Sequence, residues 1–142
     1  MQIHPLTDQL SVATQIDTDD IAALAAQGFR SIINNRPDGE IDGQPTGAEL
    51  EAVARRAGLE YRHVPVISGQ LQEAQVQAFA AALKELPEPV LAFCRTGTRS
   101  TTLWALQAEG PVDAILETAR AAGYDLTAWR SRLSAGAGER GR

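Results

Sequence analysis

Short apolar runs that alternate with amphipathic segments constrain the fold of this chain more than any other feature. Strands are predicted at residues 10–13, 29–34, 61–67 and 90–93, and helices at 17–28, 46–58, 71–86, 100–107, 111–122 and 126–133. This alternation is typical of a mostly parallel sheet covered by helices. The run 90–93 lacks polar residues, which predicts a central strand buried on both faces. We therefore expect an α/β fold, a single domain whose central sheet of about four to five strands is flanked by helices.

The length and composition of the chain fit one soluble domain. The 142 residues include 44% hydrophobic ones and carry a net charge of −5. We expect the domain to span residues 1–133 and the Gly-rich segment 134–142 to form a flexible tail. No apolar run is long enough for a membrane span, and the first residues lack a secretory signal, which favours a cytoplasmic location. An acidic chain with a single Lys is not expected to bind nucleic acid.

Cys94 is the only cysteine, and it lies where the strand 90–93 gives way to a loop and a helix. A loop of small residues at such a junction offers backbone N–H groups to an anion, and a helix N-terminus or a neighbouring Arg lowers the pKa of a thiol. We expect a Cys94 nucleophile, an Arg99 guanidinium that clamps the substrate's oxygens, and a Ser100 hydroxyl that donates to the thiolate. The remaining anion-binding candidates in the loop are Arg95, Thr96, Gly97 and Thr98. The alternative is an inert, buried cysteine beside solvated arginines.

The segment Cys94–Ser100 resembles the phosphate-binding loop of cysteine-dependent tyrosine and dual-specificity phosphatases. Together with residues 10–15, 28–40 and 61–66 and the helix through Trp104, it is similar to the phosphatase-like family once called DUF442. That family is also found fused to metallo-β-lactamase-like hydrolases. The resemblance covers roughly residues 5–110. It implies a phosphatase-like fold, and it gives Cys94, Arg99 and Ser100 the roles of nucleophile, clamp and thiolate donor.

Two departures from the phosphatase pattern bear on the reaction. Four residues rather than five separate Cys94 from Arg99, and residues 64–70, where such phosphatases carry an aspartic general acid, contain no carboxylate. Asp38 is our candidate for that acid, with Glu40 and His63 as alternatives, because the loop after strand 29–34 opens at the same sheet edge as Cys94. Arg36, in the same loop, is predicted to add charge to the anion site. Ordinary solvation of these loop residues is the competing interpretation.

Three functions follow from these patterns. The first is hydrolysis of a phosphoester through a cysteinyl-phosphate intermediate. Candidate substrates are a phosphotyrosine-type ester or another protein substrate. The second is sulfur transfer from thiosulfate or a persulfide, because the six-residue loop with Arg95 also resembles that of rhodanese sulfurtransferases. In that reaction Cys94 would carry a persulfide, and no general acid is needed. The third is a non-catalytic module that binds an anion or a phosphoprotein. In each case the ligand is a small anionic group, and neither a metal nor a cofactor is expected.

Overall fold

The computed structural model describes residues 1–140. Its elements, in chain order, are β1 (Ile3–Pro5), β2 (Leu10–Ala13), α1 (Asp20–Ala26), β3 (Ser31–Asn34), α2 (Gly47–Arg56), β4 (Glu60–His63), α3 (Glu73–Glu85), β5 (Val90–Phe93), α4 (Thr98–Gln107), α5 (Val112–Ala121), the 3₁₀ helix η1 (Thr127–Trp129) and α6 (Arg130–Arg140).

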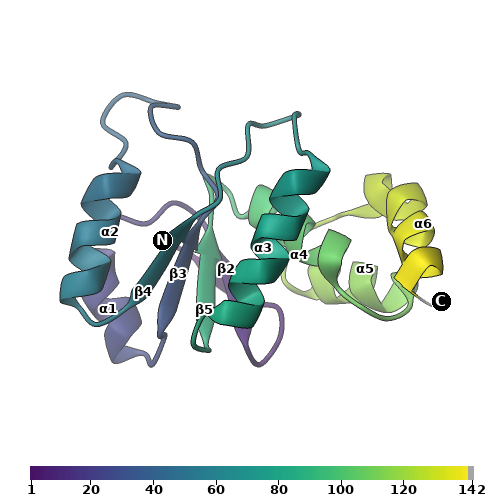
Figure 1. Cartoon of the computed structure of the whole chain (residues 1–142), viewed down its shortest axis with the longest axis horizontal. Coiled ribbons are helices and arrows are strands. Elements are labelled where there is room, and N and C mark those ends of the chain that lie inside the picture. Colours follow the sequence, from purple (N-terminus) through teal and green to yellow (C-terminus); the bar gives the residue numbers. More distant parts are fainter. Residues whose placement is uncertain (141–142) are drawn as a thin grey trace.

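The five strands form one sheet in the order β1-β2-β5-β3-β4. Strand β5 lies in the centre, parallel to β2 and β3, and all four of its residues are buried, so the predicted central strand is confirmed. Phe93 at the end of β5 is paired with Ala13 of β2 and with Asn34 of β3. The C-terminal ends of the parallel strands therefore meet at one edge of the sheet, above which two loops rise in Figure 1.

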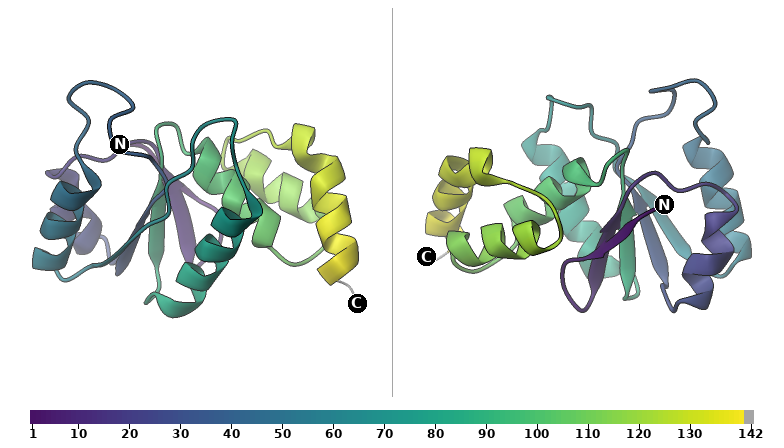
Figure 2. Two further views of the ribbon diagram at one scale, coloured as in Figure 1. Left: turned by 45° about the horizontal axis from the view of Figure 1, so that its top comes forward. Right: turned by 180° about the vertical axis from the view of Figure 1, so that it is seen from behind.

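Helices cover both faces of the sheet and divide its core into two clusters. On one face, α1 and α2 pack against residues such as Ile32 and Phe93. On the other face, α3, α4 and α5 pack against Ile33, Val90 and Ala92. Figure 1 shows the two groups of helices on opposite sides of the strands, with α6 farthest from the sheet, and Figure 2 shows β1 at the sheet edge from behind. The α/β class expected from the sequence is confirmed.

The third predicted strand is shorter than expected. The sequence pattern extends it to residue 67, but β4 ends at His63. Pro65 has no N–H group to continue the sheet, although Val64 and Val66 still donate from their backbone to the Asn34 and Asn35 carbonyls. Residues 64–72 consequently form a loop at the edge where β5 ends, which is one of the two raised loops in Figure 1.

Two ends of the chain also differ from expectation. The antiparallel edge strand β1, which the sequence pattern does not show, pairs with β2. The last helix was expected to end at residue 133, but α6 continues to Arg140; residues 141–142 lie outside the described residues, and the flexibility expected of the segment 134–142 stays a prediction. Once a helix has begun, each further residue adds a hydrogen bond at little entropic cost, which favours continuation. In residues 1–140, no helix combines the length and apolar character that crossing a bilayer requires.

Candidate active site

Cys94 lies directly after β5, in a loop that leads into α4. The residue is fully buried, and its Sγ accepts a hydrogen bond from the backbone N–H of Gly97 at 3.1 Å. Gly97 is the N-cap of α4 and has a φ of 93°, a conformation that favours glycine. This turn brings the sulfur to the helix N-terminus, where unpaired N–H groups and the helix dipole favour a negative charge. The predicted position of the thiol between a strand and a helix is therefore confirmed.

Glu40 lies between Arg99 and Arg36. Both terminal nitrogens of Arg99 donate to the Glu40 carboxylate, Nη1 to Oε2 at 2.8 Å and Nη2 to Oε1 at 3.0 Å. Arg99 Nη1 also donates to the carbonyl of Val66 at 2.8 Å. Arg36 Nε donates to Glu40 Oε1 at 2.7 Å, and Arg36 Nη1 donates to Gln15 at 2.8 Å. The result is a network in which one carboxylate is shared by two guanidinium groups.

The charges in this network shift each other's protonation. The hydrogen bond from Arg99, and then that from Arg36, hold the pKa of Glu40 below its usual value against the opposing effect of burial. Glu40 and the charge of Cys94 in turn raise the pKa of Arg99. Glu40 is thus ionised at neutral pH, and it has no proton to give to a leaving group.

The Arg36 side chain is only 2% exposed, and its Nη2 is buried with no hydrogen-bond partner among the described residues. A buried guanidinium with a free donor costs stability unless an acceptor reaches it. Arg36 also lines the cavity described below, beside Arg95 and Arg99. An oxygen of a bound anion is the kind of acceptor that would satisfy this group.

The structure brings Glu40, rather than Asp38, to the arginines. Asp38 Oδ1 accepts a hydrogen bond from the backbone N–H of Gly47 at 2.7 Å, which ties the carboxylate to the start of α2. The alternative acid His63 has its Nε2 2.9 Å from the carbonyl oxygen of Arg36, so this ring supports the loop backbone. Both side chains have a structural explanation in these contacts.

The Ser100 hydroxyl also differs from the predicted arrangement. It is fully buried and donates its proton to Asn35 Oδ1 at 2.8 Å, so in this structure that proton does not go to the Cys94 sulfur. The hydrogen bond to the Cys94 sulfur, which the sequence analysis assigned to Ser100, is donated instead by the Gly97 N–H. Asn35 in turn donates to the carbonyl of Val64, so Ser100 ties α4 to two neighbouring segments of the site edge.

Tyr124, which the sequence did not single out, supports the loop from below. Its hydroxyl donates to the carbonyl of Thr96 at 2.9 Å, and its ring fills the space in which a Cβ on Gly97 would stand. Burial and the charge of Cys94 raise the pKa of Tyr124. Because Tyr124 belongs to the connection after α5, local sequence patterns around Cys94 gave no signal of this contact.

A cavity of about 620 Å³ opens above the Cys94 loop. Its lining combines charged and polar groups, namely three arginines, the Glu40 carboxylate and loop threonines, with apolar residues from three separate segments. Of the predicted anion-binding residues, the following line it: Arg36, Arg95, Thr96, Thr98 and Arg99. Among the described residues, no group of three or more His, Cys, Asp or Glu side chains could hold a metal ion.

The sequence pattern of the family described as "Beta-lactamase hydrolase-like protein, phosphatase-like domain" matches residues 2–111. The chain belongs to this family. The resemblance expected from the sequence is confirmed, and the match includes every strand of the sheet and the whole Cys94 loop of this phosphatase-like domain.

Longer proteins of the family carry a similar domain. The beta-lactamase hydrolase-like protein of Xylella fastidiosa (strain Temecula1) is 44% identical over 106 residues, which are 75% of this chain and 25% of that protein. The one from Agrobacterium fabrum is 38% identical over 142 residues, 95% of this chain and 33% of that protein. The chain thus spans about a quarter to a third of the length of these relatives.

A solved structure shows the same fold over almost the whole chain. The crystal structure of a candidate phosphatase from Neisseria meningitidis is 36% identical, with a TM-score of 0.83, and the match covers 96% of this chain and 99% of that one. Because it includes α5, η1 and α6, the C-terminal helices are part of a shared architecture. This phosphatase-like domain therefore has the fold that the sequence predicted.

Proposed function

We propose that this phosphatase-like domain hydrolyses phosphoesters with Cys94 as the nucleophile. The observation that carries the proposal is the contact between the Gly97 N–H and the Cys94 sulfur at the N-terminus of α4, with Arg99 lining the cavity beside the same loop. The same loop that stabilises a thiolate presents further N–H groups to the oxygens of a phosphoryl group. The Arg36 donor that lacks a hydrogen-bond partner among the described residues adds support, because an anion oxygen is the kind of acceptor that it needs.

In the proposed first step, the Cys94 thiolate attacks phosphorus, and the bond between phosphorus and the leaving oxygen breaks with its electron pair on that oxygen. In the second, water attacks the cysteinyl phosphate, loses its proton to solvent and releases inorganic phosphate, which regenerates the thiolate. Arg99 stabilises the charge on the phosphoryl oxygens in both steps. Because Glu40 is held ionised by the arginines, the leaving oxygen departs without a proton from it.

This mechanism restricts the substrates. A phenolate leaves as an anion far more readily than an alkoxide, and general-acid help that is missing is worth about 10²- to 10⁴-fold in rate. We expect aryl phosphates with acidic phenols to be hydrolysed, the rate to fall steeply as the phenol becomes less acidic, and alkyl phosphates to react at least about 100-fold more slowly. We therefore expect the natural substrate, whether a protein or a metabolite, to have a leaving group of this kind.

The test is phenol release from a series of aryl phosphates by purified, metal-free protein between pH 5 and 8. Wild type is expected to turn over and Cys94→Ser to be inactive. Arg99→Lys keeps the charge but loses the fork, and we expect its kcat/KM to fall by about 100-fold or more. Turnover that persists in Cys94→Ser, or its absence from the wild type throughout this range, would overturn the proposal.

Sulfur transfer is a second candidate, and it is favoured because Arg99 is already hydrogen-bonded to Glu40. Both terminal nitrogens of Arg99 are engaged by Glu40, and the loop from Cys94 to Arg99 is one residue shorter than that of the phosphatases it resembles. A single sulfur atom needs less space and fewer donors than a phosphoryl group. The thiolate would attack the outer sulfur of thiosulfate, the S–S bond would break, and sulfite would leave with the electron pair, giving a Cys94 persulfide. An acceptor thiolate would then attack the outer sulfur of the persulfide, and the Cys94 thiolate would leave.

Intact mass separates this candidate from the first. After incubation with thiosulfate and removal of small molecules, sulfur transfer requires the mass of one additional sulfur on the wild type and none on Cys94→Ser. A non-catalytic binding module would show neither phenol release nor added sulfur, but phosphate or sulfate would slow alkylation of Cys94.

A further inference from the structure

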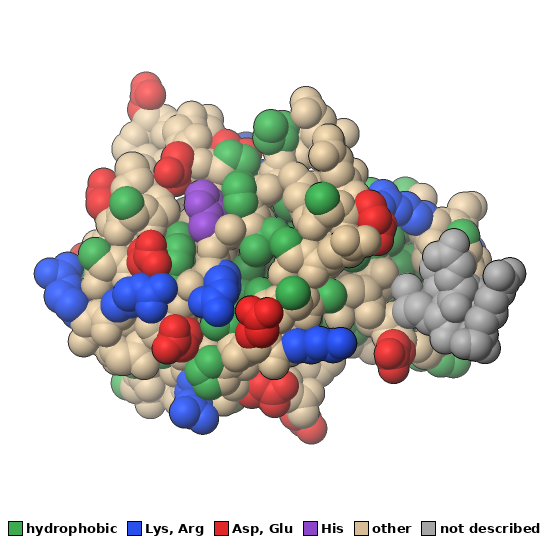
Figure 3. Space-filling model, viewed as in Figure 1, with side chains coloured by type: hydrophobic (Ala, Val, Ile, Leu, Met, Phe, Trp, Pro, Cys, Tyr) green, Lys and Arg blue, Asp and Glu red, His purple; other side chains and the backbone are tan. Residues whose placement is uncertain are grey.

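The site cavity is lined by apolar as well as charged side chains. Four hydrophobic residues line it, and we call them the apolar wall: Ile41, Val66, Leu71 and Trp129. They come from the loop between β3 and α2, the loop between β4 and α3, and η1. Figure 3 shows hydrophobic side chains gathered between the two raised loops. Ile41 is 53% exposed, which is unusual for a large apolar residue unless something covers it in use.

The size of the cavity exceeds what the reacting anion needs. A pocket of about 620 Å³ is of the size that holds a drug-sized ligand, whereas a phosphate or sulfate group is much smaller. An anion bound by the arginines would therefore leave space in a cavity that the apolar wall also lines. A ligand that fills both parts has an oxyanion at one end and an apolar substituent beside it.

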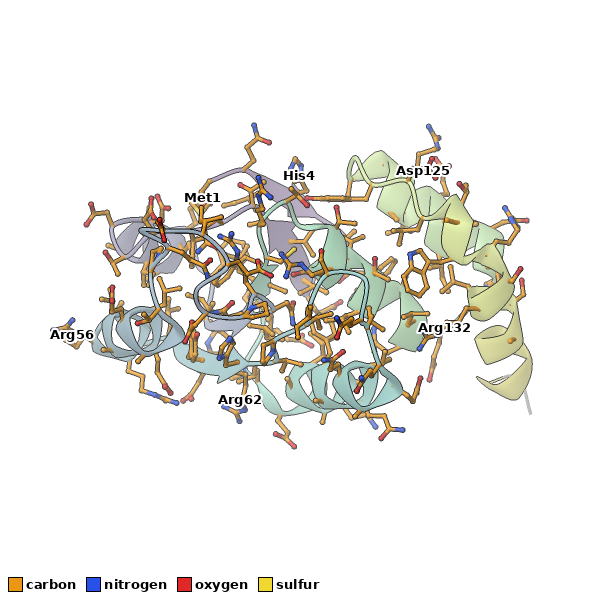
Figure 4. All side chains as sticks on the ribbon, turned by 90° about the horizontal axis from the view of Figure 1, so that it is seen from above. Met1, His4, Arg56, Arg62, Asp125 and Arg132 are labelled. Carbon is orange, nitrogen blue, oxygen red and sulfur yellow. The ribbon has the colours of Figure 1, made fainter. Side chains whose placement is uncertain are left out.

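Trp129 is the largest member of the wall and is held in place by its neighbours. The Arg132 guanidinium lies 5.5 Å from the centre of its ring, and Arg132 is paired with Glu73 at the start of α3, with 3.4 Å between Nη2 and Oε2. Figure 4 shows Arg132 extending from α6 toward the body of the molecule. Trp129 also packs against the larger core cluster, and a ring that is already packed needs little ordering when a ligand binds to it, which favours binding.

We propose that Trp129 is a specificity-determining residue, and that with the rest of the apolar wall it binds a flat apolar substituent of the substrate next to the anion site. The inference rests on the proposed function for the anion site, and it adds the residues that bind the attached group. In hydrolysis that group is the leaving phenol; in sulfur transfer it belongs to the donor or the acceptor.

The test compares naphthyl phosphate with inorganic phosphate on Cys94→Ser protein, which removes the nucleophile. In a Cys94→Ser, Trp104→Phe background, Trp129 is the sole tryptophan, so its fluorescence reports binding directly. We expect naphthyl phosphate to bind about tenfold or more tightly than inorganic phosphate and to quench Trp129. By calorimetry in Cys94→Ser, Trp129→Ala should abolish the preference while the affinity for inorganic phosphate stays within about twofold, and Trp129→Phe should keep most of it.

A matched pair guards against loss of folding in Trp129→Ala. Ile41 and Ile67 are each 53% exposed, but only Ile41 is among the residues that line the cavity. Ile41→Ala should reduce the preference for naphthyl phosphate by about threefold or more, and Ile67→Ala should leave it unchanged. Equal affinity for the two phosphates, or equal effects of the two isoleucine variants, would overturn this inference and leave the proposed function standing. Failure of both phosphates to bind would overturn the proposed function as well.

Discussion

At the scale of single residues, the site depends on how one carboxylate is shared. Glu40 neutralises one of the two arginines that it contacts, and Arg95 lines the same cavity, so the site retains positive charge even when Cys94 is ionised. The sequence placed Asp38 and Glu40 in the same loop, but which one reaches Arg99 depends on the loop path, in which Asp38 accepts a hydrogen bond from the first N–H of α2, that of Gly47. The local sequence could supply both carboxylates as candidates, but it could not show which of them contacts Arg99.

Glu40→Gln tests the strength of this network through its pH dependence. The folded-state pKa of Glu40 is lowered, so its stabilisation is fully present above the ordinary carboxyl pKa near 4.5 and is lost as the pH falls through the folded value. We expect the wild type to exceed Glu40→Gln by about 1 kcal/mol in free energy of unfolding at pH 7, and the difference to shrink below about pH 4.5. Urea denaturation at both pH values measures it.

Glu51→Gln is the matched control. Glu51 also pairs with an arginine, Arg55, but both side chains are exposed, and exposed pairs contribute little. A pH-independent difference for Glu40→Gln, or an effect no larger than that of Glu51→Gln, would contradict the role given to the network.

At the scale of elements, the anion loop is held by the turn into α4 and by a residue from the far end of the chain. Gly97 supplies the left-handed turn, and Tyr124 packs against it and donates a hydrogen bond to the carbonyl of the preceding residue, Thr96. The turn was readable from the Gly in the loop, whereas the Tyr124 contact was not, because it joins residues 28 positions apart. The shortened β4 has a local cause in Pro65 that the hydrophobic pattern obscured.

Gly97→Ala tests this arrangement. A Cβ would lie 2.1 Å from the Tyr124 hydroxyl oxygen in addition to the strain of a positive φ, so we expect a loss of about 2–4 kcal/mol in the free energy of unfolding and slower alkylation of Cys94. Gly43→Ala provides the comparison, since Gly43 has a φ of 80° but open space around it. Its cost should be about 1 kcal/mol. Equal losses in urea unfolding would show that the Tyr124 packing is unimportant.

At the scale of the whole molecule, the helices after α4 complete both the core and the cavity. The central position of β5 and the edge at which Cys94 lies followed from the alternation of elements and from parallel-sheet geometry, whereas the order of the other strands was not predicted. The contribution of η1 to the cavity could not be predicted from the sequence. The apolar pattern that identifies a helix does not say whether an aromatic such as Trp129 faces the core, a partner or a cavity formed with a distant segment. Side-chain partners across the fold were out of reach for the same reason.

Leu126→Ala measures how tightly these C-terminal helices are bound to the core. Leu126 is 2% exposed within the larger core cluster, so we expect a loss of about 2–4 kcal/mol in the free energy of unfolding, in one cooperative transition. Ile67→Ala, on the surface, should change stability by less than about 0.5 kcal/mol. A separate early transition in Leu126→Ala, with the sheet still folded, would contradict a single shared core.

The most direct test of the central claim is the intact mass of the protein quenched in acid during turnover of an aryl phosphate. Hydrolysis through Cys94 predicts that a fraction of the wild-type protein carries one phosphoryl group, located on Cys94 by peptide mapping and missing from Cys94→Ser. Phenol release without a phosphoryl group on Cys94, or a protein that takes up sulfur from thiosulfate and never phosphorus from the ester, would contradict it.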